Sequence, residues 1–405
     1  MPTLTWVSTE IRTGRVIADL PDLAGSGGGD LTLAVQMGNY QSCAVNLPLP
    51  TAPENWQRAV KEGGSVLNVL QDGNPIWGGY VSRENRTAGD EIEMSLVTLE
   101  GYLDRIYVGD ETFTGVGQNT MAQTLVNKYA VDGVLGNALP IRVVVTSGGA
   151  GPLRNRSVAD ADNKTLYSVL QDMAGIDGGI EWTIGWEHLS APERYTPIFY
   201  VGTRLGSAVT PGLAPAATFE MPGPVTDFSY SVDFGDGKGA NVVKAYSSGQ
   251  GTVLPQSAVQ SSVDPDRARF EYRWTPSTSI TDVATLTSHA ASKLAQISTG
   301  TITVSLSAVA AEAPQLFTDW NVGDDIGYTI GGLVFDPTTR IVVDIFIDTF
   351  TDLFGASGPV LVNPNGIDTV PAFPGGKSGV ARAIGWTLTL SSTPIVAPVL
   401  AGASL

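Results

Sequence analysis

The sequence predicts an α+β fold that is rich in β-structure. Glycine and proline are abundant, with 47 and 25 residues against only 6 methionines, and this composition favours strands and turns over long helices. Alternating apolar and polar residues recur towards both ends of the chain, and two helical patterns, each followed by a strand, lie between them. With 405 residues the chain is long enough for two to four domains and a sizeable core.

Residues 1–108 are predicted to form strands separated by turns, with a glycine-rich loop at 23–30. The stretch 75–103 has the pattern of a hairpin, in which an apolar strand is followed by the turn "TAGD" and a second strand. In that second strand three apolar residues alternate with polar ones, so one face is predicted to be buried and the other acidic. The apolar residues are Ile92, Met94 and Leu96, and the acidic ones are Glu91 and Glu93.

The alternation in this strand slips after Leu96. Val97 and Leu99 occupy the apolar positions from there on, which predicts a β-bulge that re-aims the strand. Bulges suit a closed or strongly curved sheet.

Residues 109–225 are predicted to be an α+β accessory domain. Helices are expected at 119–133 and 163–175, and strands at 139–147, 179–186 and 196–206. Thr120 is a plausible N-cap of the first helix, and Gly133 and Gly175 end the two helices. Their apolar stripes are Met121, Leu125 and Tyr129 in the first and Leu166, Leu170 and Met173 in the second.

Strand patterns return at 226–250 and 314–393, with an α/β insertion at 251–313 and a tail at 394–405. A proline-rich boundary at 210–224 precedes them. The helix of the insertion is expected at 279–297, with a capping box of Ser279 and Asp282 and a partner strand at 300–309. Its apolar stripe is Ile280, Val283, Ala290, Leu294 and Ile297.

The stretch "WNVGDDIGYTI" (320–330) has the rhythm of a hairpin with two carboxylates at its turn. Asp324 and Asp325 follow a glycine between two apolar segments, so an Asx-type turn accounts for both without a catalytic or metal-binding role.

The net charge of −17 is spread along the chain, with −6 over 1–108, −4 over 109–225 and −7 over 226–405. An acidic surface repels phosphate backbones, and the sequence has no cluster of Lys and Arg interleaved with aromatic residues. We therefore expect DNA to pass this protein without binding. The N-terminus has no export signal and no apolar stretch is long enough to span a bilayer, so a soluble protein made in a cytoplasm is expected.

Motifs of catalysis and cofactor binding are incomplete. "GGKS" (375–378) has no earlier glycine of a phosphate loop, and "GDGKGA" (235–240), which lacks the dinucleotide fingerprint, is better interpreted as a hairpin turn. Two pairs of aspartates, Asp160 with Asp162 and Asp264 with Asp266, have the spacing of a calcium-binding loop but lack its glycine and its final glutamate. We interpret the first pair as helix capping and the second as part of a turn.

The sequence has only one cysteine and two histidines, so few residues could bind a transition metal or act as a nucleophile. Cys43 excludes an intrachain disulfide, and His188 with His289 cannot build a multi-histidine zinc centre. We therefore predict no catalytic residue, no cofactor and no metal ligand. A glycosidase that uses a pair of carboxylates stays open, because the pairing of 40 acidic residues in space is not visible in a sequence.

In chain order, the layout resembles the tail-tip hub proteins of long-tailed bacteriophages. These are also called baseplate hub or tail-associated proteins, and phages of actinobacteria carry them as minor tail proteins. The features that resemble the family are the β segment ending in "IWGGYVSRENRTAGDEIEMSLVTLEGYLDRIYV", two helix-plus-strand units, "FYVGTRLG" and "WNVGDDIGYTI".

The resemblance implies a homotrimer in which each subunit supplies two tube-type antiparallel β-barrel domains. Three chains would then imitate six and dock on a hexameric tail tube, with the α/β units outside the ring. Here the first barrel would be 1–108 and the second 226–250 with 314–393. The implied partners in the virion are the distal tail protein, the tail tube, the tape measure protein and other minor tail or fibre proteins.

The function implied is that of a structural hub at the tip of the phage tail, which frames the channel for genome ejection during host cell entry. The alternatives are a carbohydrate-binding receptor module of the tail tip and a tail-associated cell-wall hydrolase. If three copies surround the genome's path, Glu91 and Glu93 are our candidates for acidic residues that face the lumen, because they lie opposite the buried face of their strand.

Overall fold

A computed structural model of the chain describes residues 4–401, with gaps at a set of positions. The gaps are 22, 26–28, 87, 137, 176–177, 210–213, 236, 248–254, 263–266, 277–282, 299, 332–348, 352–356, 360–376 and 391–394. The structure is 48% strand and 17% helix, which confirms the β-rich prediction. The chain forms two compact units, the first made of 1–226, 307–379 and 383–399, and the second of 227–306, 380–382 and 400–405.

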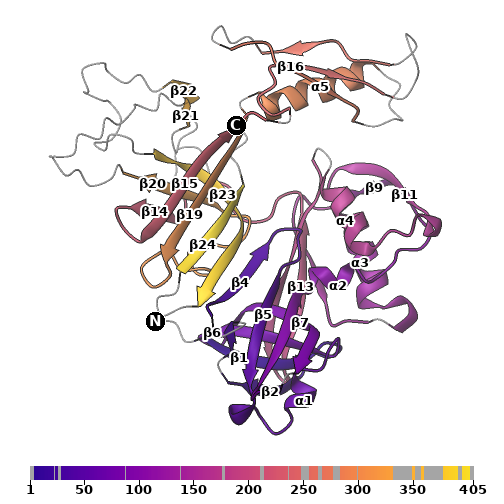
Figure 1. Cartoon of the computed structure of the whole chain (residues 1–405). Coiled ribbons are helices and arrows are strands. Elements are labelled where there is room, and N and C mark those ends of the chain that lie inside the picture. The colour runs from indigo at the N-terminus through magenta and orange to yellow at the C-terminus, as the bar shows by residue number, and fades with distance from the viewer. Residues whose placement is uncertain are drawn as a thin grey trace, which may run out of the picture. The chain divides into compact units, whose positions relative to one another are not determined.

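The N-terminal part of the first unit is a seven-stranded antiparallel sheet (Figure 1). In order across the sheet its strands are β2 (Val16–Leu20), β1 (Leu4–Glu10), β6 (Ser65–Gln71), β7 (Asn74–Arg86), β8 (Glu91–Thr98), β5 (Ser42–Pro48) and β3 (Ala24–Gly25). The interior strand β6, SVLNVLQ, is buried at six consecutive positions, as expected of a largely apolar run flanked by strands on both sides. Among the described residues β2 and β3 are edges, so the sheet is not closed into a barrel. A 3-10 turn at Leu49–Thr51 and helix α1 (Trp56–Ala59) connect β5 to β6.

The predicted hairpin of β7 and β8 is present, but the bulge lies on the other strand. Ile92, Met94 and Leu96 are buried, and the alternation continues to the buried Thr98 without a slip. The register shifts instead between Val81 and Arg83 of β7. Leu99 ends the alternation because the chain turns there into helix α2 (Glu100–Leu103).

The α+β part packs helices against a three-stranded sheet of order β10-β13-β12. Its elements are β9 (Glu111–Gly117), α3 (Gln118–Val126), a π-helical turn (Asn127–Val131), a 3-10 turn (Val134–Gly136), β10 (Arg142–Ser147), β11 (Leu153–Val158), a 3-10 turn (Asp160–Asp162), α4 (Leu166–Ala174), β12 (Glu181–Ser190) and β13 (Glu193–Gly202). All six residues of the two predicted stripes are buried, each contributing roughly 2 kcal/mol. They join Trp182 and Phe199 in one core cluster.

Both helices of this part begin differently from the prediction. The N-cap of α3 is Gly117 and not Thr120, because the carbonyl oxygen of Ala150 accepts the backbone N–H groups of Asn119 and Thr120 in the first turn. Thr165 caps α4, since its hydroxyl accepts the N–H of Ser168 at 3.1 Å. Neither carboxyl of the 3-10 turn at 160–162 caps that helix.

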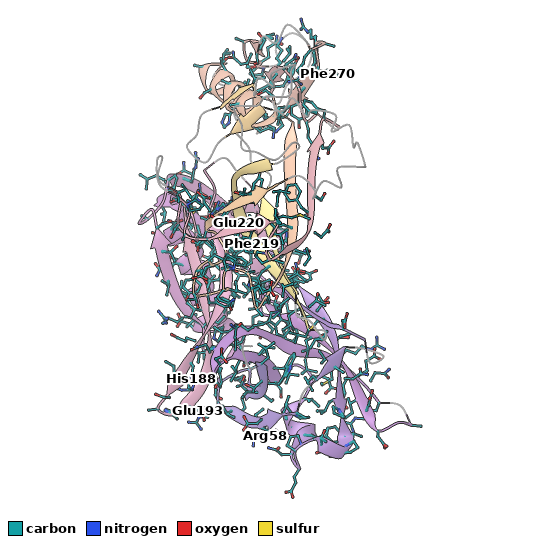
Figure 2. All side chains as sticks on the ribbon, turned by 90° about the vertical axis from the view of Figure 1, so that its left-hand side faces the viewer. Arg58, His188, Glu193, Phe219, Glu220 and Phe270 are labelled. Atoms are coloured by element: carbon teal, nitrogen blue, oxygen red, sulfur yellow. The ribbon has the colours of Figure 1, made fainter. Side chains whose placement is uncertain are left out.

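A second sheet collects strands from distant parts of the chain. Its order is β14 (Thr218–Met221), β20 (Asp325–Ile330), β23 (Lys377–Leu390), β24 (Ile395–Ala401), β19 (Thr301–Val309) and β15 (Val225–Asp233), with β4 (Leu31–Gln36) paired to β23. By sequence, β15 and β19 continue from the first unit into the second. On β14, Phe219 is buried and packs edge-on against Trp320, while Glu220 is exposed (Figure 2). The three-residue strands β21 (Thr349–Thr351) and β22 (Ser357–Pro359) pair antiparallel as a separate two-stranded sheet.

The stretch 320–330 is not a hairpin. Only Asp325–Ile330 forms a strand, β20, and its neighbours are β14, in parallel, and β23. The residues before it form a turn, in which the carboxylate of Asp324 accepts the N–H of Asn321 at 2.7 Å. A turn role for Asp324 is therefore confirmed, although its side chain bonds back along the chain.

The carboxylates of Asp324 and of Asp325, which is the first residue of β20 and not part of the predicted turn, also hold the segment 204–209. Asp324 Oδ1 accepts the N–H of Ser207 at 2.6 Å. Asp325 binds the Arg204 guanidinium at 2.6 Å and accepts the N–H of Val209 at 2.9 Å. The two aspartates thereby fasten the end of the α+β part to the start of β20.

Apart from the segments of β15, β19, β23 and β24 that belong to it, the described residues of the second unit form a short sheet and one helix. Its strands are β17 (Gln260–Ser261), β16 (Val242–Ala245) and β18 (Glu271–Trp274), and helix α5 (Val283–Ile297) packs on them. This sheet, and not the predicted strand at 300–309, is the partner of the helix. Ala290, Leu294 and Ile297 lie on the packed stripe, but Val283 is exposed; Ile280 and the predicted capping box lie outside the described residues.

No helix among the described residues is both long and apolar enough to cross a membrane.

We predict that Gly206→Ala lowers the free energy of unfolding by at least about 3 kcal/mol. Gly206 has φ +70°, and a Cβ there would lie 2.1 Å from the carbonyl carbon of Gly323, whose own φ is +98°. Gly73→Ala is the matched control, since Gly73 has φ +82° but no atom within 4 Å of the added Cβ, and it should cost only about 1 kcal/mol. Urea unfolding of the two variants measures the difference, and equal losses would contradict the close approach of the two backbones.

Candidate functional site

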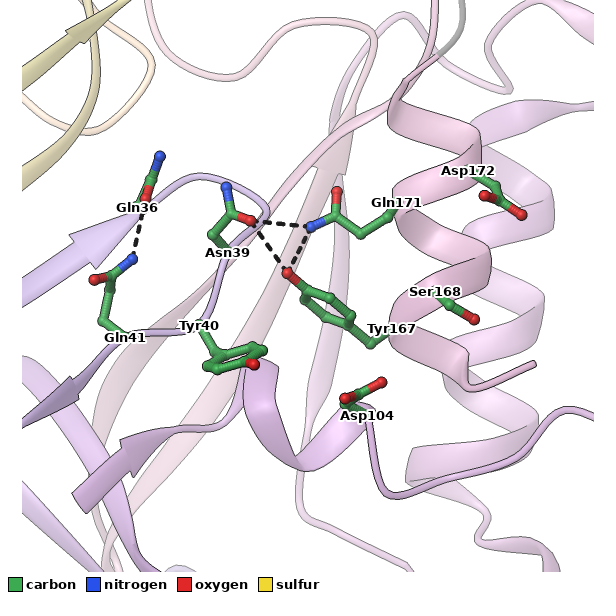
Figure 3. Close-up of a pocket in the computed structure, with 9 residues that line it drawn as sticks. All are labelled: Gln36, Asn39, Tyr40, Gln41, Asp104, Tyr167, Ser168, Gln171 and Asp172. Carbon is green, nitrogen blue, oxygen red and sulfur yellow. Dashed lines mark hydrogen bonds between the residues drawn. The ribbon is translucent and has the colours of Figure 1, made fainter. Parts of the chain in front are cut away.

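A depression of about 780 Å³, lined mostly by polar residue types, lies in the first unit between the turn after β4 and the helices α2 and α4 (Figure 3). It is lined by Gln36, Asn39, Tyr40, Gln41, Asp104, Tyr167, Ser168, Gln171 and Asp172. Three separate parts of the chain therefore contribute to the depression, and no local pattern in the sequence predicted it.

The turn at 36–41 is fixed from two sides. The N–H of Gly38 donates to the carbonyl oxygen of Trp182 on β12 at 2.8 Å, and Gly38 adopts φ +67°, which favours glycine. From α4, the amide nitrogen of Gln171 donates to the carbonyl oxygen of Gly38 and to Asn39 Oδ1. The Tyr167 hydroxyl also donates to Asn39 Oδ1, at 3.1 Å.

Tyr40 presents an aromatic ring at this depression. Its exposed fraction is 46%, large for an aromatic residue, and its ring meets that of Tyr167 edge-on with centroids 5.5 Å apart. A Cβ on Gly101 would come within 3.3 Å of the ring, so glycine on α2 lets the tyrosine lie close against that helix. The ring is therefore supported by packing as well as exposed.

Glu100 is a buried carboxyl beneath this region. Its Oε1 accepts the N–H of Ile184 on β12 at 3.0 Å, and its exposed fraction is 3%. Burial raises the pKa of Glu100 to about 7, because removal from water penalises the charged form, and hydrogen bonds from Thr98 and Ile184 offset this only in part.

A second cavity of about 470 Å³ in the first unit has an aromatic lining that includes Trp186, Tyr200, Phe317 and Trp386. Asp324 also lines it, but that carboxylate is already held by the backbone of the turns described above.

The predicted lumen residues Glu91 and Glu93 are both exposed on β8. Asn46 donates to Glu91 at 2.8 Å and Asn85 to Glu93 at 3.3 Å. They lie on the face of the strand opposite the buried Ile92, as the alternation requires, but the described residues do not bring them to either cavity. Their position relative to a channel stays a prediction.

For the other candidate residues, the structure defines the surroundings of Cys43 and His188. Among the described residues no three His, Cys, Asp or Glu side chains come together to hold a metal ion. Burial raises the pKa of the Cys43 thiol to about 12, so it is not a thiolate nucleophile. His188 stacks on Tyr195 with centroids 4.7 Å apart and lies 3.6 Å from Glu193 at the end of the β12–β13 hairpin (Figure 2).

Three sequence motifs fall partly or wholly outside the described residues or differ from expectation. Asp264 and Asp266 lie outside the described residues, as do the first two residues of the 375–378 motif. The 235–240 motif contains a turn, but it connects β15 to β16, which belong to different sheets, so it is not a hairpin turn.

The second unit contains a cluster of cations and aromatic rings that the sequence analysis did not expect. Lys244 and Arg273 lie over the ring of Tyr246 at 5.6 and 5.9 Å, and Lys293 lies 5.5 Å from the ring of Trp274. The second unit has seven acidic and seven basic residues, so the whole net charge of −17 belongs to the first unit. The prediction of no such cluster is therefore wrong here; the pairing of β16 with β18 places Lys244 beside Arg273, and helix α5 adds Lys293.

No family model and no curated protein matches the chain. Solved structures with a similar fold nevertheless include tail proteins. The tail protein from Neisseria meningitidis MC58 is 14% identical, with a TM-score of 0.56 over 98% of this chain and 97% of that one. The 43 kDa tail protein of prophage MuSo2 from Shewanella oneidensis is 10% identical, with a TM-score of 0.58 over 99% of both chains.

A third similar structure is the prophage tail protein gp18 from Listeria monocytogenes EGD-e, at 8% identity and a TM-score of 0.50 over 98% of this chain and 94% of that one. Identities this low show a shared fold and not a shared role. The chain has the fold of phage tail proteins along nearly its whole length.

We predict that Glu100→Gln removes a pH dependence of stability. The folded pKa of about 7 lies above the ordinary value of 4.5, so the native state holds the proton more tightly than the unfolded state does. The parent's free energy of unfolding should therefore fall as pH rises from about 4.5 to 7. The glutamine keeps an oxygen to accept the N–H of Ile184 but cannot ionise. The free energy of unfolding of the variant, relative to that of the parent, should therefore increase by about 3 kcal/mol from pH 4 to pH 8, measured by urea unfolding.

The exposed carboxyl of Glu54 provides the control for the loss of one negative charge. If Glu54→Gln produces the same change as Glu100→Gln, the burial of Glu100 is not its cause.

Proposed function

We propose that the chain is a structural virion protein that forms the trimeric hub of a phage tail tip. In this role it joins the hexameric tail tube and the distal tail protein to tip or fibre proteins, and it frames the channel for genome ejection. The observation that carries the proposal is the fold similarity to two tail proteins over 97–99% of their chains as well as of this one. The whole chain, and not one common module within it, follows the architecture of tail proteins.

The arrangement of the sheets supports a hub with two ring-forming domains. One seven-stranded antiparallel sheet precedes the α+β part, and a second sheet is assembled largely from strands that follow it. The strand β4 links them, because it follows the edge strand β3 of the first sheet in sequence and pairs with β23 of the second. Two β-rich bodies per chain are what three subunits need to match a six-fold tube.

The charge of the first unit supports a channel through which DNA slides. The first unit carries the full −17, so its surface repels a phosphate backbone. The tail proteins of similar fold also favour a structural role over an enzymatic one.

The purified chain is expected to be a trimer, or to become one when it is incorporated into a tail. Light scattering gives the mass in solution, and electron microscopy of tails with this chain labelled gives the copy number at the tip. Three copies at the tip are expected. Six copies, or a label along the tube instead of at its end, would overturn the hub assignment.

Reversal of charge at Glu91 and Glu93 is expected to slow or block genome delivery while tails still assemble. Two lysines per subunit facing the lumen would attract the passing phosphates, and the attraction should weaken with added salt. The matched control reverses the exposed Glu54 and Glu62, which changes the net charge by the same amount elsewhere in the first sheet's connections. Genome release from purified virions, triggered in vitro, is the measurement. Normal release by the double variant, or equal slowing by the control, would refute the lumen position.

A further inference from the structure

We infer that the depression between the 36–41 turn, α2 and α4 is a binding site for a neutral saccharide residue. The inference goes beyond the tail-hub proposal and does not depend on it, since it rests only on the chemistry of the lining residues. Three properties of the depression carry it: a supported aromatic ring, unused hydrogen-bonding atoms of both kinds, and the lack of a cation in the lining.

The aromatic ring is Tyr40. One side of it lies against Gly101 on α2, and its edge-on contact with Tyr167 fixes its tilt. The remaining surface accounts for the exposed fraction of 46% and faces the depression (Figure 3). The C–H face of a pyranose ring packs on such a surface, where it removes apolar area from water and meets the negative face of the ring.

The polar atoms match a ligand with many hydroxyl groups. The amide nitrogen of Gln41 donates to Gln36 Oε1 at 3.0 Å, which leaves Gln41 Oε1 as an acceptor and Gln36 Nε2 as a donor without another partner among the described residues. The side-chain nitrogen of Gln171 donates to the 36–41 turn, and its oxygen, which has no partner among the described residues, is left as an acceptor. Each sugar hydroxyl is both donor and acceptor, so a mixed set of amide groups suits it.

The charge of the lining selects against anions. The nine lining residues include Asp104 and Asp172 but no Lys, Arg or His. Lys164 reaches the rim only in its ion pair with Asp172. Asp104 Oδ1 accepts the hydroxyl of Thr165 at 2.7 Å, which leaves its second oxygen for a ligand hydroxyl. A phosphate or a sugar acid would meet Asp104, and the lining itself has no cation to bind it, because the nearby Lys164 is already paired with Asp172.

The site is also organised before a ligand arrives. The 36–41 turn is held by β12 through Gly38 and by α4 through Gln171, so binding does not need to order a loop. A pre-formed site loses less conformational entropy on binding, which matters for a ligand as small as one sugar. At about −0.3 kcal/mol per non-hydrogen atom, a monosaccharide is expected to bind with a Kd on the order of 1–10 mM.

The test uses the purified full-length chain and a panel of monosaccharides: glucose, galactose, mannose, rhamnose and N-acetylglucosamine. Saturation-transfer NMR detects binding, and titration gives the Kd. At least one sugar of the panel should bind, and Tyr40→Ala should weaken it at least about tenfold, while Tyr40→Phe, which keeps the ring, should stay within about threefold. Tyr107→Ala removes another exposed tyrosine, outside the depression, and should leave the Kd unchanged.

A second variant, Gln41→Ala, tests the polar side of the site independently of the ring and should also raise the Kd. Unfolding midpoints of the variants equal to that of the parent show that the losses are local. The inference is overturned if no sugar of the panel binds up to about 100 mM, or if the Kd of the bound sugar is unchanged in both Tyr40→Ala and Gln41→Ala. Tighter binding of glucuronate or glucosamine than of glucose would replace the neutral ligand with a charged one.

Discussion

The hydrogen bond from the N–H of Ile184 to the buried carboxyl of Glu100 joins the first sheet to the α+β part of the chain, and the depression is built around the helix that it anchors. Glu100 begins α2, which follows directly on β8. One residue later Gly101 supports the ring of Tyr40, and at the end of the helix Asp104 accepts the hydroxyl of Thr165, the cap of α4. The five consecutive positions 100–104 thus connect a sheet, a turn and a second helix.

Burying the carboxyl of Glu100 costs free energy, because its charged form is removed from water. A buried acid without a cationic partner is stable only as the neutral form or with enough hydrogen-bond donors, which is why the pKa of Glu100 rises to about 7. An apolar side chain at this position would remove the cost but leave the N–H of Ile184 unpaired inside the protein. The polar contact therefore fixes how α2 meets β12, and through α2 it fixes the ring of Tyr40.

Fold similarity at 8–14% identity is understandable from the same structure. The strands are specified by alternating burial and the short helices by an apolar stripe, and many different side chains satisfy either pattern. The acidic balance is divided unevenly between the two units of this chain. The net negative charge is confined to the first unit, whereas the second unit is neutral and several of its cations lie next to aromatic rings.

Local periodicity in the sequence by itself determined several elements: the buried face of β8, the stripes of α3 and α4, and the end of α4 at Gly175. These depend on neighbours within a few residues, which a sequence displays directly. The tertiary structure alone decided the bulge at Val81–Arg83, the pairing of β4 with β23 and the partner of α5. The depression belongs to this second kind, because its ring, its helix and its amides lie up to 136 positions apart in the sequence, from Gln36 to Asp172, and meet only when the core between them packs.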